Sequence, residues 1–70
     1  MRSKLKEARR KAGMTQQQMA DQLEIGLRYY KAIESGERLG AIQLWDRLED
    51  MLAVNQRVLR ENHPDKEDNP

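Results

Sequence analysis

The chain has 70 residues, a formal net charge of +1, no cysteine and one histidine, His63. This length allows one small domain, the lack of cysteine excludes a disulfide framework and a cysteine-based metal site, and a lone histidine cannot hold a metal. No apolar run approaches the roughly 20 residues of a membrane span, and the basic start lacks the apolar segment of a signal peptide. We therefore expect a cytoplasmic protein that binds no cofactor and does not associate with a membrane.

The charged residues are divided unevenly along the chain. Residues 1–11 hold six basic residues and one acid, whereas residues 41–70 hold four basic residues and seven acids. A basic front and an acidic back suit a protein that meets a polyanion with one side. An ordinary solvated helix surface explains the same distribution, so charge alone leaves both interpretations open.

The pattern predicts a first helix over residues 3–12, which Gly13 can end. Its apolar stripe consists of Leu5, Ala8 and Ala12. Arg9 lies near this stripe, where an unpaired charge is costly to bury. We therefore expect either an ion pair for Arg9 or a side chain that extends along the surface to water.

Residues 15–36 predict two short helices joined by a tight turn. Thr15 is a good N-cap residue, and Gln18 three positions later completes a capping box. The apolar sides of the two helices consist of Met19, Ala20 and Leu23 and of Ile25, Tyr30 and Ile33. Residues 24–26 leave room only for a sharp corner before the second helix, which Gly36 can end.

Behind this stretch, residues 37–40 predict a loop and residues 41–52 a fourth helix. Its core-facing side is predicted from Ile42, Trp45, Leu48 and Leu52, which recur at steps of three and four residues. Asn55 can cap a last short helix over residues 56–60. The remaining residues, 61–70, have no apolar side chain except proline rings, so we predict a disordered polar tail.

From Leu5 to about Leu59, the chain resembles the phage-repressor/Cro-like (XRE-type) helix-turn-helix family. The resemblance rests on Arg9, on the join Gly13-Met14-Thr15-Gln16, and on Ala20, Leu23, Ile25, Ile33, Glu34, Gly36, Leu48, Leu52 and Val54. It implies an all-α, compact, repressor-like domain of four to five helices over residues 1–60. The helix-turn-helix would be formed by the second and third helices.

The chain departs from the family pattern at two places. Glu24 stands at the turn position that is usually glycine, where a positive φ costs another residue roughly 1 kcal/mol. Gly40-Ala41 stands where Pro-Ser usually opens the next helix. The first departure bears on the angle between the two helices, and the second weakens a helix start.

The resemblance implies sequence-specific binding of double-stranded DNA by a transcriptional regulator that acts as a repressor, with the third helix in the major groove. It further implies a homodimer on a palindromic operator, with half-sites about 10 bp apart, and a bacterial or phage-encoded protein. No small-molecule ligand is expected.

The expected DNA contacts fall into two sets. The base-reading side chains are Leu27, Arg28, Lys31 and Ala32, and the backbone contacts are Gln16, Gln17, Gly26, Tyr29, Arg10 and Arg38. The family further implies that Glu34 pairs with Arg9. Tyr30 stands at a usually aliphatic core position, and either its hydroxyl reaches the surface near a phosphate or the whole ring is plain core packing.

Two alternatives to DNA binding differ in the support that the residues give them. An interaction module of the same fold, such as the antitoxin of a toxin–antitoxin pair, would use the polar tail to wrap a partner. A small enzyme subunit or ligand sensor has no support, because there is no glycine-rich phosphate loop and no nucleophile beside a histidine. We therefore expect no enzymatic activity.

Overall fold

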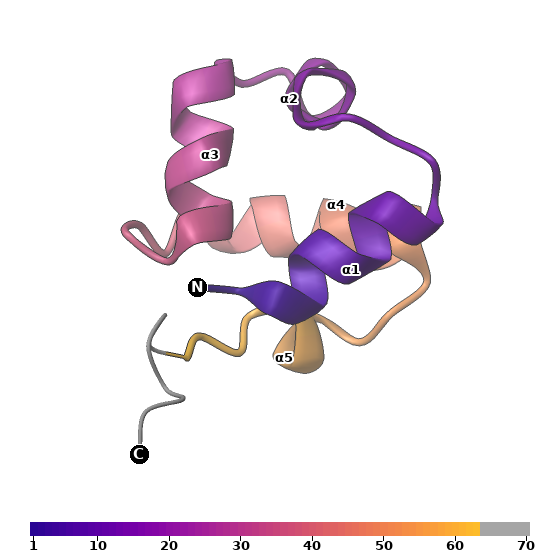
Figure 1. The fold of residues 1–70 in the computed structure, drawn as a ribbon, viewed down its shortest axis with the longest axis vertical. Helices are drawn as coiled ribbons and strands as arrows, with labels where there is room; N and C mark the ends of the chain where they lie inside the picture. The colour runs from indigo at the N-terminus through magenta and orange to yellow at the C-terminus, as the bar shows by residue number, and fades with distance from the viewer. Residues whose placement is uncertain (64–70) are drawn as a thin grey trace.

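The computed structural model describes residues 1–63, and its secondary structure there is entirely helical. The helices are α1 (Ser3–Lys11), α2 (Gln16–Leu23), α3 (Leu27–Ser35), α4 (Ile42–Leu52) and α5 (Gln56–Leu59). In Figure 1, α2 and α3 form the upper part of the molecule, α1 and α4 cross its middle, and α5 lies below them. The predicted all-α, five-helix fold is confirmed.

The corner between α2 and α3 has the geometry that the sequence predicts. Thr15 accepts a hydrogen bond from the backbone of Gln18, and the Gln18 side chain accepts one from the backbone of Thr15, which completes the capping box. Glu24 ends α2 in the left-handed conformation, with φ of 59°. Gly26 then precedes α3, and Gly36 ends it with φ of 94°. The corner between α2 and α3 therefore forms even though a non-glycine residue, Glu24, takes the left-handed conformation.

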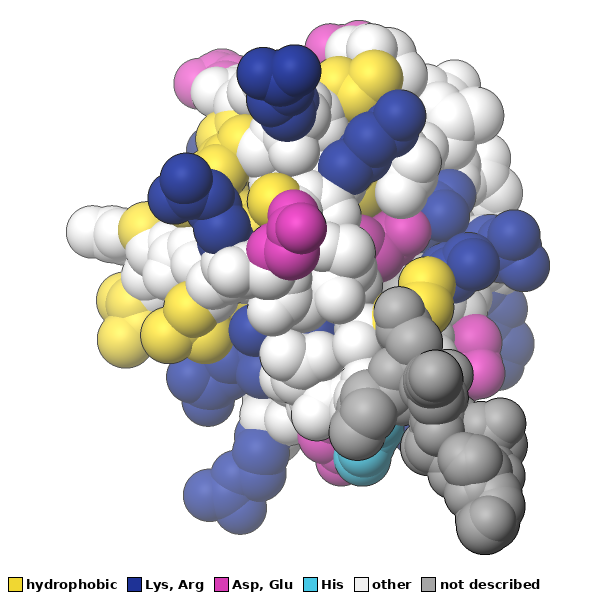
Figure 2. All heavy atoms as spheres, turned by 60° about the vertical axis from the view of Figure 1, so that its left-hand side comes forward, with side chains coloured by type: hydrophobic (Ala, Val, Ile, Leu, Met, Phe, Trp, Pro, Cys, Tyr) yellow, Lys and Arg dark blue, Asp and Glu magenta, His cyan; other side chains and the backbone are white. Residues whose placement is uncertain are grey.

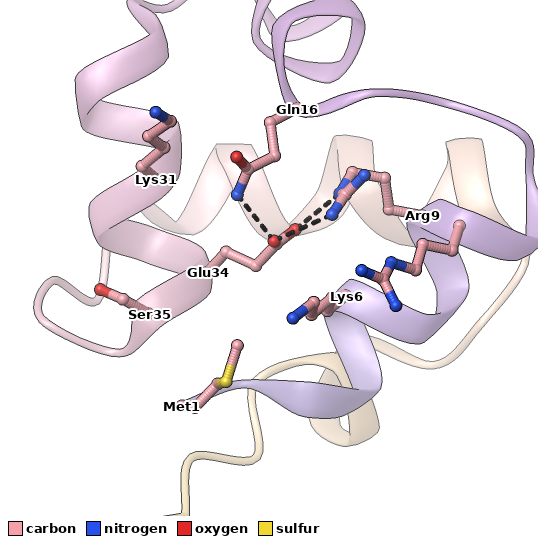
Figure 3. A pocket seen from close by; sticks show the side chains of 8 residues that line it. Met1, Lys6, Arg9, Gln16, Lys31, Glu34 and Ser35 are labelled. Atoms are coloured by element: carbon pink, nitrogen blue, oxygen red, sulfur yellow. Dashed lines mark hydrogen bonds and ion pairs between the residues drawn. The ribbon is translucent and has the colours of Figure 1, made fainter. Parts of the chain in front are cut away.

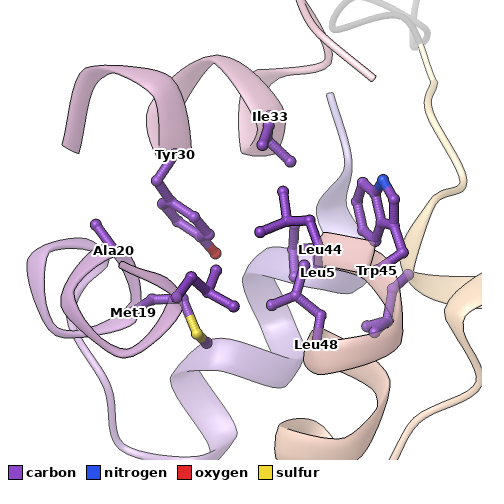
Figure 4. Close-up of a cluster of buried hydrophobic side chains, with 10 residues drawn as sticks. Leu5, Met19, Ala20, Tyr30, Ile33, Leu44, Trp45 and Leu48 are labelled. Atoms are coloured by element: carbon purple, nitrogen blue, oxygen red, sulfur yellow. The ribbon is translucent and has the colours of Figure 1, made fainter. Parts of the chain in front are cut away.

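The core gathers side chains from all five helices, with Leu5, Leu44 and Leu48 between Tyr30 on one side and the large Trp45 ring on the other (Figure 4). Its fully or nearly fully buried apolar members are Leu5, Met19, Ala20, Leu23, Tyr30, Ile33, Leu44, Trp45, Leu48 and Leu59. The burial of Ala20 against α3 fits a close approach of two helices at a small side chain. Most of the residues predicted to face the core do so.

The prediction for α4 was wrong at its first residue. Ile42 is 66% exposed, whereas Leu44, which the pattern did not include, is buried. At 3.6 residues per turn, Ile42 lies about 100° around the helix axis from the centre of the buried stripe. The i+3 step from Ile42 to Trp45 therefore starts at the edge of the stripe rather than within it. In α1, likewise, Ala12 lies just past the last helical turn and is exposed.

The described chain continues to contact the domain after α5. The side-chain amide of Asn62 donates to the carbonyl oxygen of Gly36 at 3.2 Å, and the backbone N–H of His63 donates to the carbonyl oxygen of Met1 at 3.1 Å. Residues 61–63 therefore lie beyond the predicted boundary at residue 60 and still pack on the domain. The rest of the predicted tail, residues 64–70, lies outside the described residues.

Candidate nucleic-acid interface

Helix α3 presents one side to the core and the opposite side to solvent. Tyr30, Ile33 and Glu34 are buried, whereas Arg28 and Lys31 are exposed. Leu27, Tyr29 and Ala32 lie at the margins and are partly exposed. Figure 2 brings this side of the molecule forward and shows Lys and Arg side chains at its top, at its left and along its right-hand edge, with a few acidic side chains between them. The helical period thus places all four expected base-reading residues on accessible surface.

Two grooves flank the outer side of α3. One has a volume of about 720 Å³ and is lined by Gly26, Arg28, Tyr29, Ala32, Glu37 and Arg38. The other has a volume of about 390 Å³ and is lined by Met1, Lys6, Arg9, Arg10, Gln16, Lys31, Glu34 and Ser35. The structure thus brings the expected contacts into two groups, one on each side of the helix, and separates Lys31 from Arg28.

A buried polar network joins the second groove to the interior (Figure 3). Arg9 Nε donates to Glu34 Oε2 at 2.8 Å, and Arg9 Nη2 donates to Glu34 Oε1 at 3.2 Å. Arg9 also donates through Nη1 to the carbonyl oxygen of Met14 at 2.8 Å. Both charged side chains are more than nine-tenths buried. The two residues expected to pair therefore do so, and the pair ties α1 and the loop before α2 to α3.

The side chains of Tyr30 and Gln16 complete this network. The Tyr30 hydroxyl is buried and donates to Glu34 Oε2 at 2.6 Å, so it does not reach the surface. The reason is that Glu34 lies one helical turn further along α3, directly within reach of the ring. The Gln16 side chain donates through Nε2 to Glu34 Oε1 at 2.9 Å, and its expected phosphate contact stays a prediction.

The network fixes the charge state of its members. Burial acts to raise the pKa of Glu34, but hydrogen bonds from Arg9, Tyr30 and Gln16 outweigh it and the pKa is lowered. The hydrogen bond to Glu34 raises the pKa of Arg9 despite burial. Burial, followed by the hydrogen bond to Glu34, raises the pKa of Tyr30. The Glu34 carboxylate is therefore ionised at physiological pH, and the positive charge of Arg9 balances it.

Sequence reasoning missed the role of Arg2, which it counted within a basic outer front. Its side chain is only 4% exposed, and its guanidinium carbon lies 5.3 Å from the centroid of the Trp45 ring. The side chains of Arg2 and Arg9 both form hydrogen bonds inside the domain, so neither is available to a ligand. An arginine at the second position carries no sequence signal of burial, because the carbonyl oxygens that accept its hydrogen bonds belong to the distant residues 33, 38 and 60.

The start of α2 contributes unpaired backbone groups beside the second groove. The capping box occupies the N–H groups of Thr15 and Gln18, and the N–H groups of Gln16 and Gln17 have no hydrogen-bond partner within residues 1–63. The Gln17 side chain turns away and donates to Asp21 at 2.9 Å. A helix start of this kind attracts an anion.

Residues 1–63 contain no group of three or more His, Cys, Asp or Glu side chains that could hold a metal ion. No helix among them is long and apolar enough to cross a membrane.

Comparison with known proteins gives one match. A family model described as a helix-turn-helix domain matches residues 3–43, which is more than half of the chain. The matched segment runs from the start of α1 through the α2–α3 corner to the first turn of α4. No curated protein and no solved structure matches the chain.

Proposed function

We propose, from the premise that this chain belongs to the helix-turn-helix domain family, that it is a sequence-specific regulator of transcription which reads duplex DNA with α3. DNA binding in general follows from the family. The finer statements, namely major-groove reading, repression, the dimer and the individual contacts, are our proposal. It is carried by one observation: the outer side of α3 is accessible, basic and flanked by two grooves.

Arg28 is the central base-reading residue of this proposal. It lies in the first turn of α3 and is exposed. Its planar fork matches the two acceptors that guanine presents in the major groove. Ala32 lies about 40° from Arg28 around the helix, and Leu27 is the first residue of α3, at the helix end that approaches the bases; both are partly exposed, so each can touch a thymine methyl group.

The groove beside Arg28 supplies backbone contacts in the same docking. It is lined by Gly26, Tyr29 and Arg38, which belong to the start of α3 and to the loop after it. Arg38 brings a positive charge to the rim of this groove, and Tyr29 brings a hydroxyl group. On the other side, Arg10 and the free N–H groups at the start of α2 face the opposite strand of the duplex.

The proposed regulator binds as a symmetric dimer and represses transcription by occupying its operator. A second copy would place a second α3 on the same face of the duplex about one turn, roughly 10 bp, away. A palindromic operator follows from that symmetry.

Selection of bound sites from random duplexes, followed by salt titration, tests the proposal. We expect a selected site to bind about a thousandfold more tightly than a scrambled duplex at physiological salt. We also expect both affinities to fall steeply with salt, because neutralised phosphates release counterions. Recovery of no common sequence, or binding that does not respond to salt, would refute it.

A further inference from the structure

We infer that the groove between α1 and α3, at the start of α2, holds a backbone phosphate of the DNA, with Lys6 and Lys31 as its cationic walls. This inference rests on the proposed function. It adds Lys6 to the interface and moves Lys31 from base reading to phosphate binding. The groove of Lys6 and Lys31 is called the phosphate groove below.

Three elements that are distant in sequence build the phosphate groove. Helix α1 contributes Lys6 and Arg10, the start of α2 contributes Gln16, and α3 contributes Lys31. In Figure 3, Lys6 and Lys31 come from opposite sides of the groove and Gln16 from above. The volume of about 390 Å³ is ample for one phosphate group with its sugar.

The charges in the phosphate groove are not balanced. Its one acid, Glu34, accepts hydrogen bonds from Arg9, Tyr30 and Gln16 and is neutralised inside the network. Three cationic side chains remain, those of Lys6, Arg10 and Lys31, and among residues 1–63 none of them is in an ion pair. Three unpaired cations around a neutralised carboxylate make a site for an anion.

Backbone groups add to the same attraction. Gln16 lines the groove, so the start of α2 lies at its rim. The free N–H groups of Gln16 and Gln17 and the positive end of the α2 dipole favour a negative charge there. The side-chain amide of Gln16 is already bound to Glu34, so the phosphate contact from this residue comes from its backbone.

The direction of Lys31 explains why its partner is a phosphate and not a base. Lys31 and Arg28 differ by about 60° around the axis of α3, and Lys31 lies on the side of Glu34. A helix in the major groove faces base edges with its outermost residues and faces a sugar–phosphate strand with each flank. Arg28 therefore faces the bases, and Lys31 faces the strand beside α1.

Lysine-to-glutamine variants of the full chain test the inference, with Lys4 as a matched control. Lys4 lies on the same helix as Lys6 and is exposed, but it lines a different groove with Val54 and Val58. We expect Lys6→Gln to weaken binding several-fold on selected and scrambled duplexes alike and to lower the salt slope by about 0.9. Lys4→Gln should leave both quantities unchanged, although the change in net charge is the same.

A scan with single methylphosphonates, which remove the charge of one phosphate at a time, locates the contact. One position should weaken binding by the wild-type chain and by Lys4→Gln clearly more than binding by Lys6→Gln, in which Lys31, Arg10 and the backbone N–H groups still face the phosphate. Lys31→Gln should lower affinity on every duplex by a similar factor and keep the base preferences. A changed preference at one base pair would overturn the inference and make Lys31 a base reader.

The failure of this inference and the failure of the proposed function give different results. If the wild-type chain binds a selected duplex with a steep salt slope while Lys6→Gln and Lys4→Gln both match it, only the phosphate groove is wrong. Equal losses in the two variants would also overturn it, because they would reflect net charge alone. If the wild-type chain binds no duplex, both statements are wrong.

Discussion

Arg2 Nη1 donates a hydrogen bond of 2.6 Å to the carbonyl oxygen of Ile33, near the end of the proposed reading helix. The same guanidinium donates to the carbonyl oxygens of Arg38 at 2.8 Å and Arg60 at 3.2 Å. The last carbonyl groups of a helix have no partner within it, so a buried donor at this place satisfies groups that water cannot reach. One side chain thus joins the end of α3, the loop after it and the end of α5.

Replacement of Arg2 by methionine should lower the free energy of unfolding by about 3 kcal/mol, because buried carbonyl groups lose a charged donor. Arg2→Lys should recover only part of the loss, since an ammonium lacks the planar fork. Urea denaturation measures both, with Lys4→Met as an exposed control on the first turn of α1. A stability loss no larger than that of the control would contradict the structural role of Arg2.

Arg9 and Glu34 should be strongly coupled. Arg9→Met or Glu34→Gln alone should cost about 3 kcal/mol, because each leaves a buried charge or buried polar groups without a partner. The double variant should cost clearly less than the sum of the two. A double-mutant cycle from denaturation curves gives the coupling energy, and strict additivity would rule out the buried pair.

Acid should weaken the fold through Glu34. Its pKa is lowered in the folded chain from an ordinary value of 4.5, so the unfolded chain takes up the proton first as pH falls. The stabilisation is therefore complete above the ordinary value and is lost as pH falls toward the folded one. Melting temperatures of the wild type and Glu34→Gln should differ most near neutral pH and converge in acid. A difference that stays constant with pH would contradict this.

Two truncations within the predicted tail should have different effects on the stability of the fold. A chain that ends after His63 should melt almost like the full chain, because residues 64–70 contain only polar side chains and proline. A chain that ends after Arg60 should lose about 1 kcal/mol, because Asn62 and His63 no longer bond to Gly36 and Met1. Thermal melts of the two chains measure this difference. Identical melting temperatures would show that the contacts of residues 61–63 do not stabilise the fold.

The local features of the fold were predictable because they depend on neighbours in sequence. The capping box of Thr15 and Gln18 needs only a three-residue spacing. The left-handed conformation of Glu24 was expected from the family resemblance, because the family usually has glycine at this turn position. Trp45 could be placed in the core because it recurs with other apolar residues at helical steps.

The remaining features depend on contacts between segments that are distant in sequence. The helical period of the apolar residues does not predict such contacts. The burial of Arg2 requires carbonyl groups from residues 33, 38 and 60. The hydrogen bonds that Tyr30 and Gln16 donate to Glu34 both depend on where Glu34 lies after the helices have packed. In the candidate interface, the outer side of α3 was predictable from the helical period, but its division into two grooves was not.

The most direct test of sequence reading by α3 compares Arg28→Ala with Gln16→Ala on a selected operator and on a set of single-base variants of it. Arg28→Ala should lose about 1–3 kcal/mol on the operator and relax the preference at one base pair. Gln16→Ala should keep every base preference and should change the affinity for all duplexes little and alike, because the phosphate contact of Gln16 comes from its backbone N–H group. Both variants should remain folded in melting experiments. If Arg28→Ala weakens every duplex equally and keeps every base preference, α3 does not read the sequence through Arg28, and the proposed docking is wrong.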